Sequence, residues 1–350
     1  MAERNHEVTQ VQPLLTSEGA LREPGWSRKL YQVYDRKAIK APAFRIKEWD
    51  YYLVVGKDFA AAFTISDDGY IGLQSVSLLD FTQDGKPWEQ TSTVLVPFTM
   101  GRLHMPHTTE RGNVSFRNKK LDMNFYKYEG GRHILVEYKE FLDGKTFTAD
   151  IKLDEPEMDT MVIATPWDEK KTAFYYNRKI NCMRASGYVE FNGKRYEFNP
   201  ATDYGTLDWG RGVWTYDNTW YWGSGNATIK GKPFGFNIGY GFGNTAAASE
   251  NIVFYDGVGH KLDDVSFNIP KDANGNPDYM KPWTFTSSDG RFEADFVPIL
   301  DRAAKIDLKV IISDQHQVFG RMTGKAILDN GEVLEFKDLL CFAEDVHNKY

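Results

Sequence analysis

The 350-residue chain has little of what marks several classes of protein. It contains two cysteines, Cys182 and Cys341, which give neither a disulfide framework nor a zinc-ligand spacing. No apolar run is long enough for a transmembrane helix, and the N-terminus lacks the apolar stretch of a signal peptide. These absences predict a protein of the reducing cytoplasm without a membrane span.

Charge and motif content exclude further classes. Lys and Arg total 42 against 49 Asp and Glu, and basic groupings such as Arg117-Asn-Lys-Lys120 are too short for a nucleic-acid surface. The pair His104 and His107 brackets Pro106 with no Cys or acid at a ligand spacing. We therefore expect no metal and keep His104 as a candidate base or ligand contact. No phosphate-binding glycine motif or nucleophile elbow occurs, so we expect no cofactor.

Aromatic residues and period-two alternation are what the chain has in quantity. Phe, Tyr and Trp make up 15% of it, which favours strands. The segment Thr146–Leu153 places its apolar residues on one face. Asn192-Gly193 and Asn330-Gly331 each stand between alternating segments and predict hairpins. The best helical candidate is a short piece near Arg4–Leu21. The pattern predicts an all-β protein built of antiparallel barrels or curled sheets.

Motifs recur in the same order in the two halves of the chain, which indicates an internal duplication. Each match is weak by itself, and the shared order and spacing carry the prediction. The recurring pieces are Trp49 with Phe63-Thr-Ile65 and Trp222 with Phe236-Asn-Ile238, each 14 residues apart, then Arg184-Ala-Ser-Gly187 and Arg321-Met-Thr-Gly324, each before an Asn-Gly turn.

The duplication divides the chain into two tandem β units. The first is predicted over residues 1–202, including an N-terminal arm, and the second over residues 203–350. Units of about 150 residues are large enough for one sheet to curl around a core. A ligand pocket is expected at or near their junction, because seams between β units are usual places for pockets.

The predicted junction carries the densest cluster of candidate site residues. Asp203–Trp214 holds two acids, one arginine, three glycines and two tryptophans, which we interpret as a sharp, Gly-rich bend. Asp208 and Arg211, three residues apart, are expected to pair there. The pair is either a buried clamp that locks the junction or part of a catalytic site, with Asp208 as proton donor and Arg211 as an orienting residue.

Glu250-Asn251 is the second candidate catalytic pair. It follows a loop of small residues, Thr245–Ser249, which lets a ligand approach. A glutamic acid whose pKa is raised by an apolar pocket can act as a general acid while the neighbouring amide orients the substrate. The alternative for Asn251 is hydrogen bonding to the loop backbone.

Aromatic side chains cluster around these acids. Trp220 and Trp222 alternate along a predicted strand and share one face, with Tyr221 on the other. Such a group either lines a ligand pocket or fills an ordinary β core. The candidate ligand-binding aromatic residues are Trp209, Trp214, Trp220, Trp222 and Tyr240.

Four segments together resemble a bacterial family known as domain of unknown function 2804. They are Glu23-Pro-Gly-Trp-Ser-Arg28, Lys47-Glu-Trp-Asp-Tyr-Tyr52, Asp208-Trp-Gly-Arg-Gly-Val-Trp214 and Glu250-Asn-Ile-Val-Phe-Tyr-Asp-Gly257. That family is distantly similar to proteins with paired lipocalin-like domains, such as carotenoid 1,2-hydratase, kievitone hydratase, tocopherol cyclase and fungal Diels–Alderases. The resemblance implies two calycin-like β units around an apolar pocket, and it assigns no catalytic residue here.

Three functions follow as hypotheses. The first is a cofactor-independent hydratase, lyase or isomerase, assisted by an acid and acting on a hydrophobic or polycyclic small molecule. The second is a carrier or sensor of an apolar metabolite. The third is a carbohydrate-active protein that stacks sugars on its aromatic rings and uses Asp208 and Glu250. Each has a small-molecule partner, and the oligomeric state stays open.

Overall fold

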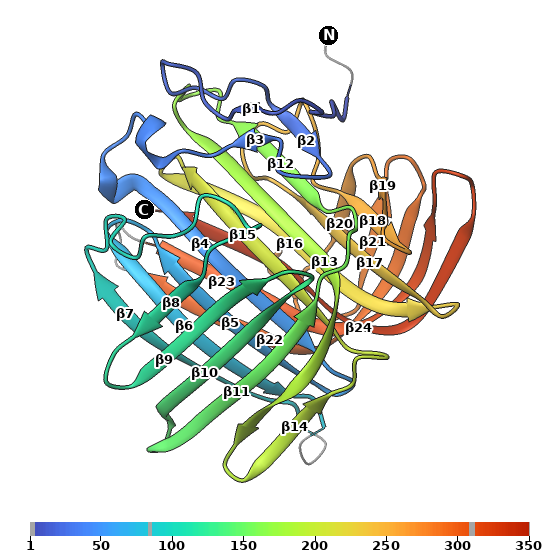
Figure 1. The fold of residues 1–350 in the computed structure, drawn as a ribbon. Helices are drawn as coiled ribbons and strands as arrows, with labels where there is room; N and C mark the ends of the chain where they lie inside the picture. Colours follow the sequence, from blue (N-terminus) through green and yellow to red (C-terminus); the bar gives the residue numbers. More distant parts are fainter. Residues whose placement is uncertain (1–3, 83–85, 308–311, 350) are drawn as a thin grey trace.

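The computed structural model describes residues 4–82, 86–307 and 312–349 (Figure 1). Over these residues the chain is built of β-strands, with two single-turn 3-10 helices, η1 (Arg36–Ala38) and η2 (Ala43–Arg45). The predicted all-β class is confirmed. The helix expected near Arg4–Leu21 is wrong, because this segment forms turns, bridges and the strand β1 (Gln12–Pro13), which pairs with β3 (Gln32–Val33). No helix in the described part of the chain is long and apolar enough to cross a membrane.

The first sheet contains 13 strands and curls around its own core. Alternation decides which side chains enter that core: Phe147, Ile151 and Leu153 on one face of strand β11 (Lys145–Asp154) are all buried. Asn192 and Gly193 both adopt a positive φ, as a two-residue hairpin turn requires. The strands are β2 (Gly25–Ser27), β4 (Ile46–Val55), β5 (Phe59–Asp67), β6 (Ile71–Asp80), β7 (Trp88–Pro97), β8 (Val114–Arg117), β9 (Leu121–Tyr128), β10 (Gly131–Leu142), β11 (Lys145–Asp154), β12 (Met161–Pro166), β13 (Phe174–Phe191), β14 (Lys194–Phe198) and β15 (Tyr204–Val213).

The second sheet contains nine strands. The turn at Asn330-Gly331 connects its last two strands as predicted, although only Gly331 has a positive φ, so the connection is a longer loop than at Asn192-Gly193. The strands are β16 (Asp217–Ile229), β17 (Lys232–Tyr240), β18 (Ile252–Tyr255), β19 (Val258–Lys261), β20 (Val265–Asn268), β21 (Trp283–Ser287), β22 (Phe292–Asp307), β23 (Ile312–Ile327) and β24 (Val333–Lys349).

The two sheets have corresponding strand orders. The run β7-β6-β5-β4-β15-β13-β11-β10-β9 in the first sheet matches β19-β18-β17-β16-β24-β23-β22-β21-β20 in the second. The recurring tryptophans occupy matching strands, with Trp49 on β4 and Trp222 on β16. The correspondence agrees with the predicted duplication, and a common origin of the two halves stays a prediction.

Strand β15 carries the glycine-rich motif and lies in the middle of the first sheet. It pairs with β4 on one side and with β13 on the other. The bend expected in Asp203–Trp214 is therefore wrong, because residues 204–213 form a regular strand. The chain changes sheet after Val213, since β16 begins at Asp217. The boundary predicted at residue 203 lies one strand before this change, and the division into two domains stays a prediction.

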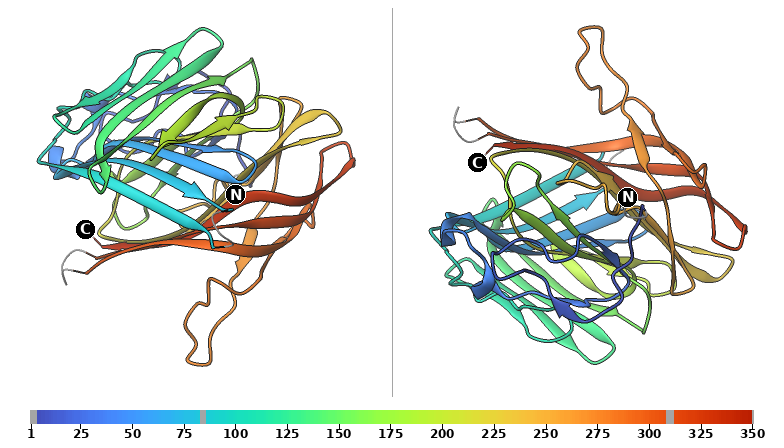
Figure 2. Two further views of the ribbon diagram at one scale, coloured as in Figure 1. Left: turned by 90° about the horizontal axis from the view of Figure 1, so that it is seen from below. Right: turned by 90° about the horizontal axis from the view of Figure 1, so that it is seen from above.

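The second sheet lies along one side of the curled first sheet (Figure 2). Each sheet has its own apolar core. A separate apolar cluster joins the two sheets and explains why they pack face to face. Its buried members are Leu53, Ala60, Ala62 and Leu79 from the first sheet and Trp222, Phe319 and Phe342 from the second.

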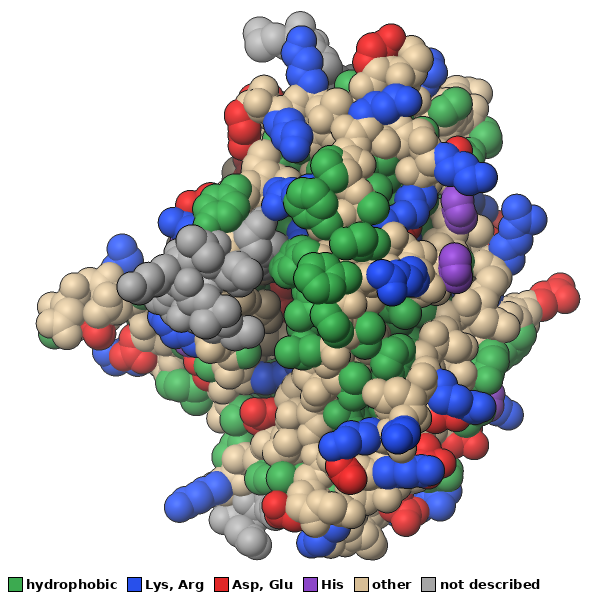
Figure 3. Space-filling view, turned by 90° about the vertical axis from the view of Figure 1, so that its left-hand side faces the viewer, with side chains coloured by type: hydrophobic (Ala, Val, Ile, Leu, Met, Phe, Trp, Pro, Cys, Tyr) green, Lys and Arg blue, Asp and Glu red, His purple; other side chains and the backbone are tan. Residues whose placement is uncertain are grey.

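Hydrophobic side chains also gather on the outer face drawn in Figure 3, with Lys and Arg beside them. Phe44, Phe98 and Met100 are among the exposed large hydrophobic residues of the chain. Their segments meet at Gly69, which lies against the Phe44 backbone and accepts a hydrogen bond from the Met100 N–H at 2.9 Å. The connections around β4, β5 and β7 thus leave apolar surface exposed.

Candidate functional site

A pocket of about 360 Å³ lies between the two sheets and is called the seam pocket below. Small-molecule sites typically have volumes of about 300–1,000 Å³. Both sheets contribute lining residues, from β4–β7, β13 and β15 on one side and from β16 and β22–β24 on the other. The lining includes the aromatic residues Trp49, Tyr51, Tyr175, Trp214, Trp220, Trp222 and Phe242, the acids Asp68, Glu89, Asp208, Glu250 and Glu344, and the bases Lys179 and Arg302.

Two glycines of β15 make room for the aromatic wall of this pocket. A Cβ on Gly210 would lie 1.9 Å from Cζ2 of Trp49, whereas a Cβ on Gly212 would lie 2.5 Å from the Phe174 carbonyl oxygen and 3.2 Å from Nε1 of Trp214. The Trp49 ring therefore lies directly against the strand, and it meets Trp214 edge-on with the ring centroids 5.4 Å apart. Gly210 thus permits the close packing of a ring and Gly212 the close approach of the neighbouring strand, and neither forms the turn expected from the sequence.

Asp208 faces the pocket from β15. Its carboxylate accepts a hydrogen bond from Asn177 Nδ2 at 2.5 Å and forms a salt bridge with Lys179 Nζ at 2.9 Å. The same Nζ lies 3.7 Å from the centroid of the Trp222 ring. Because both charges are almost excluded from water, each depends on the other for compensation. Asp208 is thus held by two residues of β13.

Arg211 and Trp209 lie on the opposite face of β15, inside the core of the first sheet. Arg211 is fully buried and donates to the Asp50 carboxylate at 3.1 Å and to the Trp49 carbonyl at 2.8 Å. Its guanidinium lies 4.3 Å from the Trp209 ring centroid. The expected Asp208–Arg211 pair is wrong, because residues three apart on a strand point to opposite faces. Arg211 forms its buried clamp with Asp50 instead.

Glu250 reaches the pocket from the connection between β17 and β18. It is 8% exposed, and its Oε2 atom has no hydrogen-bond partner. Burial raises the pKa of Glu250, and the charge of nearby Lys179 opposes that rise. A buried carboxyl oxygen without a donor calls for an explanation in function, since buried polar atoms are nearly always bonded.

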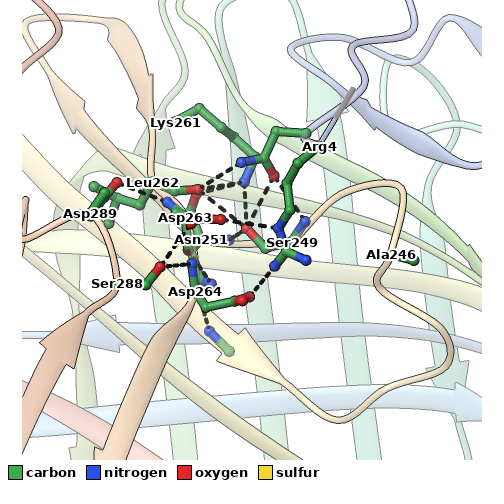
Figure 4. Close-up of polar contacts among 12 residues, drawn as sticks. Arg4, Ala246, Ser249, Asn251, Lys261, Leu262, Asp263, Asp264, Ser288 and Asp289 are labelled. Carbon is green, nitrogen blue, oxygen red and sulfur yellow. Dashed lines mark hydrogen bonds and ion pairs between the residues drawn. The ribbon is translucent and has the colours of Figure 1, made fainter. Parts of the chain in front are cut away.

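Figure 4 shows the hydrogen bonds around Ser249 and Asn251, the two residues that flank Glu250 in the chain. Asn251 accepts from a backbone N–H of β17 at 2.7 Å and donates to the Asp263 carbonyl at 2.9 Å. Lys261 Nζ donates to the Asn251 carbonyl at 2.7 Å and to the Ser249 hydroxyl at 2.9 Å, so it bonds both neighbours of Glu250. Burial lowers the pKa of Lys261 to about 7. The Asn251 side chain is thus engaged in hydrogen bonds to the backbone, which is the alternative that the sequence left open beside orienting a substrate.

Glu344 of β24 enters the pocket from the second sheet. The strand register places it beside Trp222 of β16 and Gln317 of β23. Its carboxyl group accepts hydrogen bonds from Trp220 Nε1 at 3.1 Å and from Gln317 Nε2 at 3.2 Å. Burial raises the pKa of Glu344 to about 7. At neutral pH a large fraction of this carboxyl group therefore holds its proton.

Three of the candidate tryptophans, Trp214, Trp220 and Trp222, line the pocket. Trp214 and Trp220 both meet Phe242 edge-on, with ring centroids 4.8 and 5.0 Å apart. On the first sheet Tyr175 stacks on Trp49 with the ring centroids 6.2 Å apart. The acids are thus surrounded by aromatic rings, which explains the pKa values raised by burial.

Tyr240 and His104 lie away from the seam pocket. Tyr240 stacks on Tyr221 with the ring centroids 4.6 Å apart, and both pack against the core of the second sheet. Tyr221 thus occupies the face opposite Trp220 and Trp222, as alternation predicts. His104 is exposed in the connection after β7, with a φ of 51°. Among the described residues no group of three His, Cys, Asp or Glu side chains is arranged to hold a metal ion.

Sequence reasoning missed Glu344 and Lys179 as site residues. The available signal was a charged residue inside, or directly after, a run of residues that the strand buries. Glu344 follows the buried run Leu339–Ala343, and Lys179 lies in the buried segment Phe174–Met183. A charge at such a position must face a partner or a pocket, because an unpaired buried charge is costly.

A second depression, of about 620 Å³, opens on the first sheet between its loops and β-hairpins. Its charged side chains are largely committed to one another. Arg178 is paired with Glu110, and Glu155 is paired with Arg132 at 2.8 Å. The depression also lacks the tryptophan wall of the seam pocket. We therefore take the seam pocket as the candidate functional site.

Comparison with known proteins places the chain in a family. The model of the family described as domain of unknown function DUF2804 matches residues 5–350. The chain belongs to this family. No curated protein matches it in sequence.

Solved structures with the same fold include kievitone hydratase from Nectria haematococca, at a TM-score of 0.52 and 11% identity, covering 97% of this chain and 98% of that one. Another is a Nitrosomonas europaea protein given as a candidate AttH, at a TM-score of 0.51 and 12% identity, covering 89% of this chain and 95% of that one. At these identities the similarity shows only that this DUF2804 member shares their fold, and it does not assign a function.

Proposed function

We propose that this DUF2804 protein is a cofactor-independent, acid-assisted hydro-lyase or isomerase that acts on a mainly apolar small molecule in the seam pocket. The observation that carries the proposal is Glu344, whose pKa of about 7 lets it hold a proton at neutral pH and give it up to a substrate. The fold similarity to a protein named as a hydratase supports the same reaction class.

The two glutamates have complementary roles in this proposal. In the elimination direction Glu344 donates its proton to the leaving hydroxyl group, so that the C–O bond breaks and water departs. The Glu250 carboxylate, whose Oε2 has no other partner, accepts a proton from the neighbouring carbon as the C=C bond forms. Hydration is the reverse: Glu344 accepts the proton of the attacking water and Glu250 protonates the alkene carbon.

The remaining lining residues position the substrate and exclude water. The Trp220 and Gln317 side chains orient the Glu344 carboxyl group through their hydrogen bonds. The Asp208–Lys179 pair keeps a compensated charge at the wall of the pocket. Arg211 lies on the other face of β15, so the proposed mechanism gives it a structural role.

An untargeted conversion assay tests the proposal. The protein is incubated with an organic extract of its native host in H₂¹⁸O, and mass spectrometry identifies compounds that gain or lose one water. We expect a conversion that falls about 10²–10⁴-fold in Glu344→Gln and in Glu250→Gln. Asp203→Asn removes a buried acid outside the pocket and serves as the matched control.

Two results would contradict the catalytic role. If both glutamine variants convert the compound at the wild-type rate, neither acid takes part in the chemistry. If compounds co-purify with the wild type and return unchanged after long incubation, the protein is a carrier. A bound or cleaved sugar would favour the carbohydrate-active alternative.

A further inference from the structure

The acids of the seam pocket are only partly compensated by the protein itself. The lining contains five acids and two bases. Lys179 is committed to Asp208, and Arg302 donates to two neutral oxygens, Thr91 Oγ1 at 3.2 Å and Gln317 Oε1 at 2.8 Å. Within the described residues no cation forms a salt bridge with Glu250. Among the described residues Glu250 and Glu344 therefore form no salt bridge, although the charges of Lys179 and Lys261 act on Glu250 from nearby.

Glu250 provides the independent indication of a ligand. Its residue is 8% exposed, it lines the pocket, and its Oε2 lacks any hydrogen-bond partner. The other carboxyl groups differ in this respect, since Asp208 is bonded by Asn177 and Lys179, and Glu344 by two neutral donors. A buried carboxyl oxygen without a hydrogen-bond partner, on a residue that lines a cavity, is a position that a bound group can satisfy.

The surroundings of Glu250 select the kind of group. Tyr175, Trp214, Trp220 and Phe242 line the same pocket, and the π-faces of such rings attract positive charge. Among the described residues the acids do not converge into a metal-binding group. Carboxylates spread along an aromatic wall suit a large organic cation with diffuse charge better than a compact metal ion.

We propose that the seam pocket binds an organic cation, with a tertiary or quaternary ammonium group between the Glu250 carboxylate and the aromatic wall. The inference rests on the proposed function in naming the ligand class of the same pocket: an apolar molecule that carries a basic nitrogen. Such a nitrogen also resembles the positive carbon that forms when an alkene is protonated, so amines would inhibit turnover as well as bind.

An isostere series tests the inference by binding alone. The probes are benzyltrimethylammonium, its neutral carbon isostere neopentylbenzene, and phenylacetate as the anion, measured by tryptophan fluorescence and calorimetry. We expect the wild type to bind the cation about tenfold more tightly than the neutral isostere and to bind the anion most weakly. Glu250→Gln should abolish this preference and leave neopentylbenzene affinity unchanged, whereas the control Asp203→Asn should keep both.

Each other result overturns the inference. Equal or tighter binding of neopentylbenzene, tighter binding of phenylacetate, or failure of the cation to bind at millimolar concentration would end it, and none of these needs a variant to fold. A cation preference that survives in folded Glu250→Gln would refute the assigned position. If the pocket prefers the neutral probe but turnover still depends on the two glutamates, the hydro-lyase proposal stands and the organic-cation inference fails. If the cation binds but no compound is converted, the hydro-lyase proposal fails and the organic-cation inference stands.

Discussion

Replacing Glu344 with glutamine is expected to remove a loss of stability that the wild type shows between about pH 5 and pH 7. Burial raises the pKa of Glu344 to about 7 from its ordinary 4.5. Between these values the folded protein keeps a proton that the unfolded chain has released. The folded state then binds more protons than the unfolded state, so the free energy of unfolding falls as pH rises through this window.

The size of the effect follows from the two pKa values. One pKa unit corresponds to about 1.4 kcal/mol, so the full loss is about 3 kcal/mol, of which about 2 kcal/mol falls between pH 5 and 7.5. These are upper values, because Glu344 keeps some contact with the open pocket. The stabilising contribution is fully present below about pH 4.5 and is lost by the time the pH has passed about 7.

The variant also carries a change that does not depend on pH. A glutamine at position 344 keeps an oxygen for Trp220 Nε1, but its amide N–H faces Gln317 Nε2, which is itself a donor. Gln317 cannot simply turn over, because its oxygen accepts from Arg302 at 2.8 Å. We expect a constant penalty of about 1–3 kcal/mol from this mismatch. The slope with pH, rather than the stability at one pH, therefore reports on the carboxyl group.

Urea unfolding from pH 5 to pH 7.5, followed by circular dichroism and tryptophan fluorescence, measures the effect. Coincident transitions are required before free energies are compared, since the chain has two sheets. Titrating groups that do not interact with Glu344 cancel in the difference between wild type and variant. Glu137→Gln removes an exposed strand glutamate and is the control. A wild-type minus variant difference that stays constant across this range would show that Glu344 titrates as an ordinary surface acid.

Three further predictions concern residues around the pocket. Gly210→Ala should lower the free energy of unfolding by about 1–3 kcal/mol or more, because its methyl group would displace Trp49. Gly223→Ala should lower it less in the same unfolding assay, because a Cβ at Gly223 would lie 3.2 Å from its nearest neighbour, a side-chain carbon. Lys179→Met should lower the free energy of unfolding by about 3–5 kcal/mol, because it leaves the Asp208 carboxylate without its ion-pair partner. The double variant Lys179→Met with Asp208→Asn should recover much of this loss, and no recovery would mean that the two residues are not coupled. The wild type should gain stability from about pH 7 to pH 10, because the pKa of Lys261 is lowered to about 7 and the unfolded chain therefore binds more protons than the folded protein in this range. Lys261→Met should remove this gain, and parallel pH curves for wild type and variant would contradict the prediction.

Features that depend on local sequence could be predicted. The strand alternation, the turn at Asn192-Gly193 and the shared face of Trp220 and Trp222 all follow from the two-residue period of a strand. Asp208 and Glu250 were also proposed as site residues from their neighbours alone, and both line the seam pocket. Alternation applied to residues 204–213 would have placed Asp208 and Arg211 on opposite faces, but the glycines of that segment indicated a bend instead.

The misreading of those glycines has a physical cause that the sequence cannot show. Gly210 has an ordinary strand conformation, and it is glycine because the ring of Trp49, from a strand far away in the chain, occupies the place of its side chain. Glycine serves both for left-handed turns and for close approach of another group. Only the pairing of β15 with β4 distinguishes the two uses, and that pairing is a long-range property.

Glu344 was missed for the same reason, and its case shows where the chemistry of this fold comes from. Taken along the chain, it is one acid near the end of a strand. Register places it beside Trp222 and Gln317, and packing of the two sheets brings Asp208 and Lys179 from the other side. Burial by both sheets raises the pKa of Glu344 to about 7, so its acidity is a property of their contact. A change that separates the sheets without touching Glu344, such as weakening the apolar cluster at Phe342, should therefore lower that pKa towards its ordinary value.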